Sequence, residues 1–238
     1  MENSQRLSYP RLPYKSEFMG VIVGMLLGDG SICKKYTHKL TLCQGEKQKD
    51  YLDLKCEILK SFGYKMFAVR TNINGFGDGS NGKKYKKFIV DFGDKRNEWF
   101  YRKFYGGGKR KITYQFIRHL NQYGLAIWFM DDGNNQMSKK KSKKHPEGVR
   151  QNYYYLNTQG YSYEENVMLQ EMLEKKFGLI SNIHKDKKYF KLYFGAKGNG
   201  AKTLANLVRP YIHPMFNYKL DYKDTLNAVK SEDIVQSQ

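Results

Sequence analysis

Two acidic residues, Asp29 and Asp132, follow two similar apolar segments about a hundred positions apart. Each segment has the length of a helix, and each acid is followed directly by glycine. A carboxylate beside so much apolar surface is costly unless a cation takes up its charge. Hard divalent ions with oxygen ligands, Mg²⁺ above all, are the expected partners. Two metal ions held between two acids would support phosphodiester hydrolysis.

The apolar segments must bring these acids together. Gly20, Gly24 and Gly28 follow one another at intervals of four, so they line one face of a helix. Small residues on one face allow two helix backbones to approach closely. If the second apolar helix packs there, the C-terminal ends of both helices meet, and Asp29 and Asp132 form a paired site at a two-fold axis. A lone Gly-Asp-Gly is more often a simple turn.

The rest of the chain repeats in the same order. Asp29 and Gly93 are 64 positions apart, and Asp132 and Gly195 are 63 positions apart. Hydrophobic periodicity predicts a strand, a helix and two further strands in each half. The expected elements are 39–43, 47–62, 65–70 and 88–92, then 153–156, 163–177, 180–184 and 189–194. We interpret the chain as two α/β repeats, each with an antiparallel sheet that carries helices on one face.

The charge balance indicates a nucleic-acid partner. The chain has 42 Lys+Arg against 23 Asp+Glu, a formal net charge of +19 and a sequence pI near 9.6. The alternatives are a cationic soluble protein and a membrane-surface binder. A sheet can enter the major groove of duplex DNA, or its charged face can be merely solvated. The lysines in or beside the expected strands are Lys84, Lys86, Lys87, Lys185, Lys187, Lys188 and Lys191.

A second group of lysines follows the second acid. Lys139, Lys140 and Lys141 belong to a run of five lysines within positions 139–144. We expect this run in a loop between strands, where it contacts DNA phosphates or simply aids solubility.

The cysteines and apolar runs restrict the setting of the protein. Cys33, Cys43 and Cys56 are odd in number and form no Cys-x-x-Cys pair, which argues against a disulfide framework or a zinc site. No apolar run approaches the roughly 20 residues of a membrane span, and the first residues do not read as a secretory signal. We expect an intracellular protein without a membrane partner, in a prokaryotic cytoplasm or an organelle matrix.

The segments 22–30 (IVGMLLGDG) and 125–133 (LAIWFMDDG) resemble the two nine-residue signatures of a single-chain LAGLIDADG homing endonuclease. The resemblance covers roughly residues 15–222. It implies an α+β fold of two pseudo-two-fold αββαββα repeats, with the motif helices at the interface and an antiparallel β-saddle on DNA. The expected divisions are an N-terminal extension 1–14, repeats 15–113 and 114–222, and a tail 223–238.

The resemblance also assigns the metal site by position. Asp29 and Asp132 occupy the metal-binding position of the motifs, and Gly28 and Asp131 precede them. Asp131 stands one residue off along the helix and is expected to point away from the metals. Ile127 stands where the first helix has Gly24, so the expected interface is a knob against a groove and not glycine on glycine.

The family also keeps a lysine near each active site, late in each repeat. In the second repeat the match is Lys219, and in the first it is Lys109 or Lys111. A polar residue that orders water corresponds to Gln44, and its counterpart is Asn157 or Gln159. For either lysine, the alternative role is a basic turn that touches phosphate only.

These inferences together predict a monomeric, site-specific double-strand DNA endonuclease. It would hydrolyse phosphodiester bonds with Mg²⁺, or Mn²⁺ in its place, and leave short 3′ overhangs on a long asymmetric target. One alternative is a maturase that binds the group I intron RNA of its host on the same scaffold. The other is a DNA-binding regulator that has lost the chemistry, which intact acids and nearby lysines disfavour.

Overall fold

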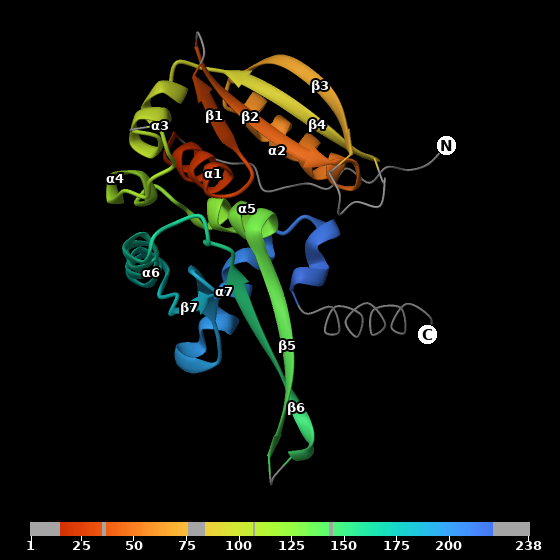
Figure 1. Cartoon of the computed structure of the whole chain (residues 1–238), viewed down its shortest axis with the longest axis vertical. Helices are drawn as coiled ribbons and strands as arrows, with labels where there is room; N and C mark the ends of the chain where they lie inside the picture. The colour runs from red at the N-terminus through yellow and green to blue at the C-terminus, as the bar shows by residue number, and fades with distance from the viewer. Residues whose placement is uncertain (1–14, 35–36, 76–83, 107, 143–144, 221–238) are drawn as a thin grey trace, which may run out of the picture.

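The computed structural model describes residues 15–34, 37–75, 84–106, 108–142 and 145–220. Within these ranges the side chains of 15–16, 74–75, 84–85, 137–142, 145–151 and 197 are not described. Two four-stranded antiparallel sheets lie on either side of a central pair of helices (Figure 1). The expected α+β fold is therefore confirmed.

The two repeats have the same element order. The first contains α1 (Lys15–Leu27), β1 (Ser31–Lys34), β2 (His38–Gly45), η1 (Glu46–Gln48), α2 (Lys49–Ser61), β3 (Lys65–Gly75), β4 (Lys84–Gly93), α3 (Asn97–Phe104) and α4 (Tyr114–Ile117). The second contains α5 (Gln122–Asp132), β5 (Gly133–Ser142), β6 (His145–Leu156), α6 (Tyr163–Phe177), β7 (Asn182–Asp186), β8 (Tyr189–Phe194), η2 (Lys197–Asn199), α7 (Gly200–Val208), η3 (Arg209–Tyr211) and η4 (Pro214–Lys219).

Strand order and register repeat as well. The sheets run β1-β2-β4-β3 and β5-β6-β8-β7. Leu42 pairs with Val90 in the first sheet, and Leu156 pairs with Leu192 in the second. All four side chains are buried, so the helices cover the same face of each sheet. The other face of each sheet carries the side chains of opposite parity.

Local sequence explains the clearest helix. Ser162 and Glu165 form a capping box at the start of α6, and Gly178 ends it in the left-handed conformation. The expected helix 163–177 and the strand 189–194 have the bounds that the sequence predicted.

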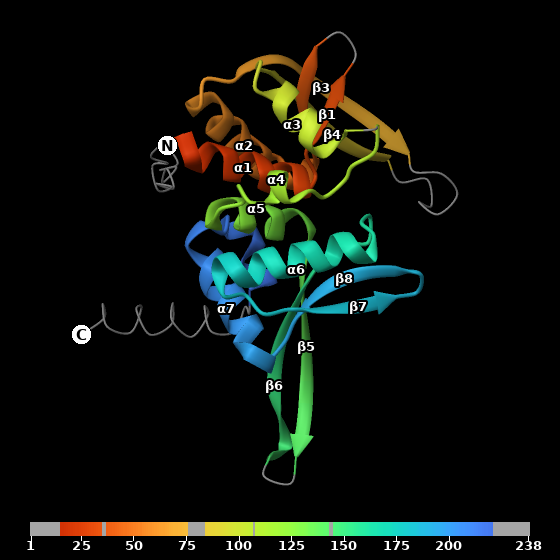
Figure 2. The ribbon, with the colours of Figure 1, turned by 90° about the vertical axis from the view of Figure 1, so that its left-hand side faces the viewer.

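The motif helices α1 and α5 lie side by side between the sheets (Figures 1 and 2). A Cβ added to Gly24 would collide with the backbone of Gly124, and one added to Gly124 would collide with the carbonyl of Gly20. The expected knob-against-groove interface is therefore wrong. Gly124, which precedes the nine-residue motif, supplies the small residue that Ile127 cannot.

The expected loop for the second lysine run is also wrong. The backbone of β5 continues through Lys139 and Lys140, which pair with Arg150 and Val149 of β6. Strands β5 and β6 form a long hairpin that extends away from the rest of the molecule (Figures 1 and 2). Extended pairing satisfies the backbone hydrogen bonds of this polar segment without a buried core. Residues 143–144 of the run lie outside the described part.

None of the helices in the described residues is long and apolar enough to cross a membrane.

The helix contact can be tested with Gly24→Ala, whose methyl group has no room against Gly124. We expect a loss of at least about 1–3 kcal/mol in the free energy of unfolding, because overpacking forces the helices apart. Denaturant unfolding measures the loss. The matched control is Gly45→Ala, since nothing lies within 4 Å of a Cβ there. Equal stability of both variants would contradict the close contact.

Candidate active site

The motif acids lie where the C-terminal ends of α1 and α5 meet. Asp29 follows α1 and is exposed, whereas Asp132 is the last residue of α5 and is half-buried. Burial raises the pKa of the Asp132 carboxyl to about 7, and the negative charges of Asp29 and Asp131 act in the same direction. The two acids therefore influence each other electrostatically, as a paired site requires.

Asp131, one residue before Asp132, lies buried beside Asp29 and binds a lysine. Its side chain is fully buried against Gly28, where a Cβ would collide with its carboxylate. Lys55 of α2 binds both of its oxygens, with Nζ at 2.6 Å from Oδ1 and 2.8 Å from Oδ2. Gly28 contributes space to this arrangement and has no side chain to offer a metal.

Gln44 lies in the site, at the end of β2. Its side chain is buried, and its Nε2 donates to Oδ2 of Asp29 at 2.9 Å and to Oδ1 of Asp131 at 3.4 Å. The amide therefore holds the exposed carboxylate of Asp29 beside the buried one of Asp131. A polar residue was expected at this position, and the structure shows that Gln44 forms a hydrogen bond with Asp29.

Lys219 lies under the C-terminal end of α5. Its Nζ donates to the carbonyl oxygen of Met130 at 2.6 Å and to that of Phe129 at 3.5 Å. Burial lowers the pKa of its ammonium group, while the charges of Asp131, Asp132 and Asp29 raise it. The cation neutralises the negative end of the helix dipole next to Asp132.

Arg110 has the corresponding place in the first repeat. Its Nη2 donates to the carbonyl oxygen of Gly30 at 2.7 Å, and its Nη1 donates to that of Gly28 at 3.5 Å. It also acts electrostatically on Asp132, whose pKa it lowers. Only lysines were expected in this role, so Arg110 was not predicted. The signal was present, because Arg110 stands between the two lysines that were considered.

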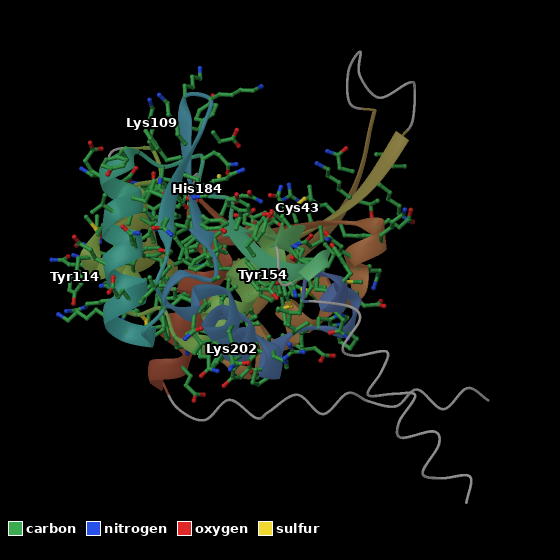
Figure 3. All side chains as sticks on the ribbon, turned by 90° about the horizontal axis from the view of Figure 1, so that it is seen from below. Cys43, Lys109, Tyr114, Tyr154, His184 and Lys202 are labelled. Carbon is green, nitrogen blue, oxygen red and sulfur yellow. The ribbon has the colours of Figure 1, made fainter. Side chains whose placement is uncertain are left out.

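Those two lysines share a surface hollow with Arg110. All three side chains are exposed and line it with Glu164 and Glu165, but of the three it is Arg110 that donates to the carbonyls of Gly28 and Gly30. Figure 3 shows Lys109 at the outer edge of the molecule. Arg110, which stands between these lysines in the sequence, is therefore the residue that binds the segment after α1.

The second-repeat counterpart of Gln44 is set by the strand register. Thr41 pairs with Asp91 and Tyr155 pairs with Tyr193, so the residue three positions further is Gln44 in β2 and Thr158 after β6. Thr158 is buried and donates to Asn166. The expected counterparts lie elsewhere: Asn157 donates its backbone N–H to the Asp132 carbonyl at 3.1 Å, and the Gln159 side chain donates to Asp186 at 3.5 Å.

The donor set fits a hard cation that completes its shell with other ligands. No group of three or more His, Cys, Asp or Glu suited to a metal occurs among the residues described. Asp29 and Asp132 supply two carboxylates, and burial first, then the charges of Asp29 and Asp131, raise the pKa of the Asp132 carboxyl. Mg²⁺ characteristically takes one or two carboxylates together with water and substrate phosphates.

The open face of the first sheet carries an anchored arginine. Arg70 of β3 donates from Nη2 to Oδ2 of Asp91 at 2.7 Å, and Thr41 donates to the other oxygen at 2.9 Å. The Arg70 side chain is 56% exposed, so donors of its guanidinium face solvent in a fixed direction.

Lysines of β4 alternate between the two faces of the first sheet. Lys86 pairs with Glu46 on the helix side, whereas Lys87 shares the parity of Asp91.

The open face of the second sheet is aromatic. His184 stacks on Tyr193 with ring centroids 4.1 Å apart, and Tyr155 lies 3.4 Å from His184 Nδ1 through its hydroxyl oxygen. Lys191 places Nζ 4.4 Å from the Tyr155 ring centre and 3.3 Å from Asp186. Burial lowers the pKa of the His184 imidazole, and Lys191 lowers it further, so the ring is neutral near pH 7.

The remaining expected DNA contacts have varied positions. Lys185 pairs with Phe190, whose parity is that of the helix-covered face, and Lys187 and Lys188 form the β7–β8 turn. The backbones of Lys84, Lys139, Lys140 and Lys141 belong to β4 and β5, and their side chains lie outside the described part. Figure 3 shows His184 and Cys43 between the strand ends of the two sheets that project toward the top of the view, and Lys202 toward the bottom.

Comparison with known proteins agrees with this architecture. Residues 19–201 match the model of the LAGLIDADG DNA endonuclease family. The chain belongs to this family. A probable intron-encoded DNA endonuclease 3 of Mycosarcoma maydis is 38% identical over 107 residues, 45% of this chain and 68% of the relative. A cytochrome b mRNA maturase bI2 of Debaryomyces hansenii is 28% identical over 216 residues, 87% of this chain and 75% of the relative.

A solved structure shares the fold of this LAGLIDADG protein. The homing endonuclease I-WcaI bound to its DNA recognition sequence has a TM-score of 0.65 and 24% identity, with 88% of each chain covered. At this identity the likeness shows the fold alone.

The raised pKa of Asp132 predicts a pH dependence of stability. The native carboxyl keeps its proton up to about pH 7, whereas the ordinary value is 3.8. Native metal-free protein therefore holds the extra proton between these values, and the stability contributed by this group is lost as pH rises through about 7. We expect the free energy of unfolding in chelator to fall more steeply from the ordinary value of 3.8 up to about pH 7 for the wild type than for Asp132→Asn, and the two curves to run parallel above that range.

Urea unfolding at several pH values measures this difference. The control is Asp53→Asn, which changes an exposed carboxylate of α2 that pairs with Lys49. Parallel curves for the wild type and Asp132→Asn below about pH 7 as well would contradict the assignment.

Proposed function

We propose that the chain is a site-specific double-strand DNA endonuclease. The observation that carries the proposal is the pairing of Asp29 and Asp132 at the joined ends of α1 and α5, with one cationic side chain, Arg110 or Lys219, at each end. This arrangement concentrates negative charge where a divalent cation can bind and positive charge beside it. Membership of the LAGLIDADG DNA endonuclease family supports the same activity.

Asp29 and Asp132 would hold Mg²⁺, for which Mn²⁺ would substitute. When bound, the ion supplies charge stabilisation at the phosphate and lowers the pKa of water, which is the chemistry that phosphodiester hydrolysis needs. A bound cation would offset both the burial of Asp132 and the repulsion between the acids, which raise the pKa of the Asp132 carboxyl.

The chain's own cations act on the scissile phosphates. Arg110 is held by the carbonyls of Gly28 and Gly30 just after α1, and Lys219 by carbonyls in the last turn of α5, so each presents its charge without reorganising during the reaction. The amide of Gln44 donates to Oδ2 of Asp29, and Oδ1 of the same carboxylate would be the oxygen that binds the metal. These residues orient the acids and stabilise the negative charge that develops on phosphate oxygens.

The two sheets would bind the duplex. The net charge of +19 provides the sequence-independent attraction to phosphates. Arg70, held by Asp91, can donate to base edges in the major groove, while Tyr155, His184 and Tyr193 offer neutral groups on the other half. One chain contains both halves, so we propose a monomer that recognises an asymmetric target and leaves short 3′ overhangs.

The activity is tested by incubating the chain with a randomised duplex-DNA library in Mg²⁺ and sequencing the cut ends. We expect discrete cuts by the wild type and none by Asp29→Asn/Asp132→Asn. Loss of metal binding removes several kcal/mol of transition-state stabilisation, which is roughly a thousandfold in rate or more. Gel-shift assays should show that the double variant still binds the selected site. Normal cutting by the double variant would refute the site.

Arg110 can be distinguished from its lysine neighbours by substitution. Arg110→Met should lower kcat by on the order of a hundredfold, as for removal of one preorganised donor. Lys109→Met and Lys111→Met should change kcat much less, because among the contacts of the described residues it is Arg110 that is held at the carbonyls of Gly28 and Gly30. Single-turnover cleavage of the selected target measures all three. If Lys109→Met or Lys111→Met had the largest effect, the assignment of Arg110 would be wrong.

The likeness to a maturase over 87% of the chain favours RNA binding as the second candidate function. Both functions would use the basic surfaces, but only the nuclease needs the paired acids. Competition between the selected duplex and a structured group I intron RNA, in a filter-binding assay, separates the two. Preference for the intron RNA together with absence of DNA cutting would favour the maturase.

A further inference from the structure

A buried ion pair joins the two repeats next to the acids. Lys55 lies on α2 of the first repeat and Asp131 on α5 of the second, and their side chains are 1% and 0% exposed. Two charges inside a protein are tolerated only when their geometry is good and their remaining polar atoms are hydrogen-bonded. The contacts made by Asp131 therefore reveal what the pair supports.

Both oxygens of Asp131 lead to Asp29. The backbone N–H of Asp29 donates to Oδ2 of Asp131 at 3.2 Å, and Gln44 bridges Oδ1 of Asp131 and the carboxylate of Asp29. Asp131 also occupies the space that Gly28 leaves beside its backbone. The ion pair thus contacts Asp29 at its backbone and, through one amide, at its side chain.

Lys55 is itself held in a fixed position. Its Nζ lies 4.3 Å from the ring centre of Tyr51, and the Tyr51 hydroxyl donates to the Ile127 carbonyl at 3.3 Å. The ammonium group therefore has an aromatic face on one side and the carboxylate of Asp131 on the other. This packing leaves the charge of Asp131 directed toward Asp29.

The residues at the corresponding positions of the second repeat do not form such an ion pair. Alignment of Phe62-Gly63 with Phe177-Gly178 places Gln170 at the position of Lys55, and its side chain donates to the Ser181 carbonyl instead. Gly28 stands at the motif position that Asp131 has in α5. The ion pair therefore supports Asp29 and has no equivalent that supports Asp132.

We propose that Lys55 and Asp131 are positioning residues that orient Asp29 for metal binding, and that they favour cleavage of one DNA strand over the other. The strand preference rests on the proposed nuclease function, whereas the metal affinity does not. Asp131 is a hydrogen-bond acceptor for the Asp29 loop and not a metal ligand.

The test compares the wild type with Lys55→Met and with Lys55→Met/Asp131→Asn. Lys55→Met leaves a buried carboxylate without its cation, so it should be strongly destabilised. The double variant removes both charges and should recover stability. However, the single side-chain oxygen of an asparagine at 131 cannot stand in for both carboxylate oxygens, which accept separately from the Asp29 N–H and from Gln44, so the Asp29 carboxylate should remain misplaced.

Two readouts separate positioning from a merely structural role. Electron paramagnetic resonance of Mn²⁺ titrated into the chain without DNA should show affinity on the order of tenfold weaker for the double variant. Cleavage of a supercoiled plasmid carrying the selected site should accumulate nicked circles in the double variant, because one strand is cut more slowly. Lys49→Met, which breaks the exposed Lys49–Asp53 pair on the same helix, is the control and should behave as the wild type.

Wild-type Mn²⁺ affinity in the stable double variant, or equal slowing of both strands, would overturn the proposal. A wild type that cuts no DNA would refute the proposed function separately. The Mn²⁺ titrations would still decide whether Lys55 and Asp131 orient Asp29.

Discussion

The backbone contact between α1 and α5 is the constraint on which the site depends. Gly24 and Gly124 let the two helices touch backbone to backbone, and Gly20 leaves room for the Asn121 side chain, so both helix ends converge. Convergence brings the motif carboxylates and the negative ends of two helix dipoles into one small volume. Such a concentration of negative charge is unfavourable by itself, and it explains why buried or anchored cations surround it. Geometry thus comes from small residues, and the electrostatic consequence of that geometry creates the binding site.

The two half-sites solve the same electrostatic problem with different residues. Arg110 neutralises the end of α1, whereas Lys219 neutralises the end of α5. The buried carboxylate beside Gly28 is balanced by Lys55, and within the described residues the second repeat has Gln170 at the position of Lys55. A single chain permits such differences, because the two repeats can vary independently while the shared interface is kept. Similar folds of the halves and dissimilar surroundings of the acids are therefore compatible, and they suit an asymmetric DNA target.

Much of this arrangement could be predicted from local patterns. Helix α6 and strand β8 were predicted because capping residues and alternating burial act within a few positions, and the motif acids were found because the segment repeats. Arg110 was missed because its role depends on a carbonyl from another element, 80 positions away. Gly124 was missed because the contact is set by how α5 is rotated against α1. The buried Lys55–Asp131 pair joins residues 76 positions apart and has no periodic signal.

The open faces of the two sheets indicate how recognition is divided along a target. Arg70 is held by a carboxylate and keeps free donors, which is the chemistry that reads guanine edges. In the second sheet, neutral His184 and the tyrosines around it can both donate and accept, and their stacking restricts how they move. Lys191 of that sheet already faces Asp186 and an aromatic ring. We therefore propose that arginine readout belongs to the first half of the saddle and that neutral hydrogen bonding contributes in the second.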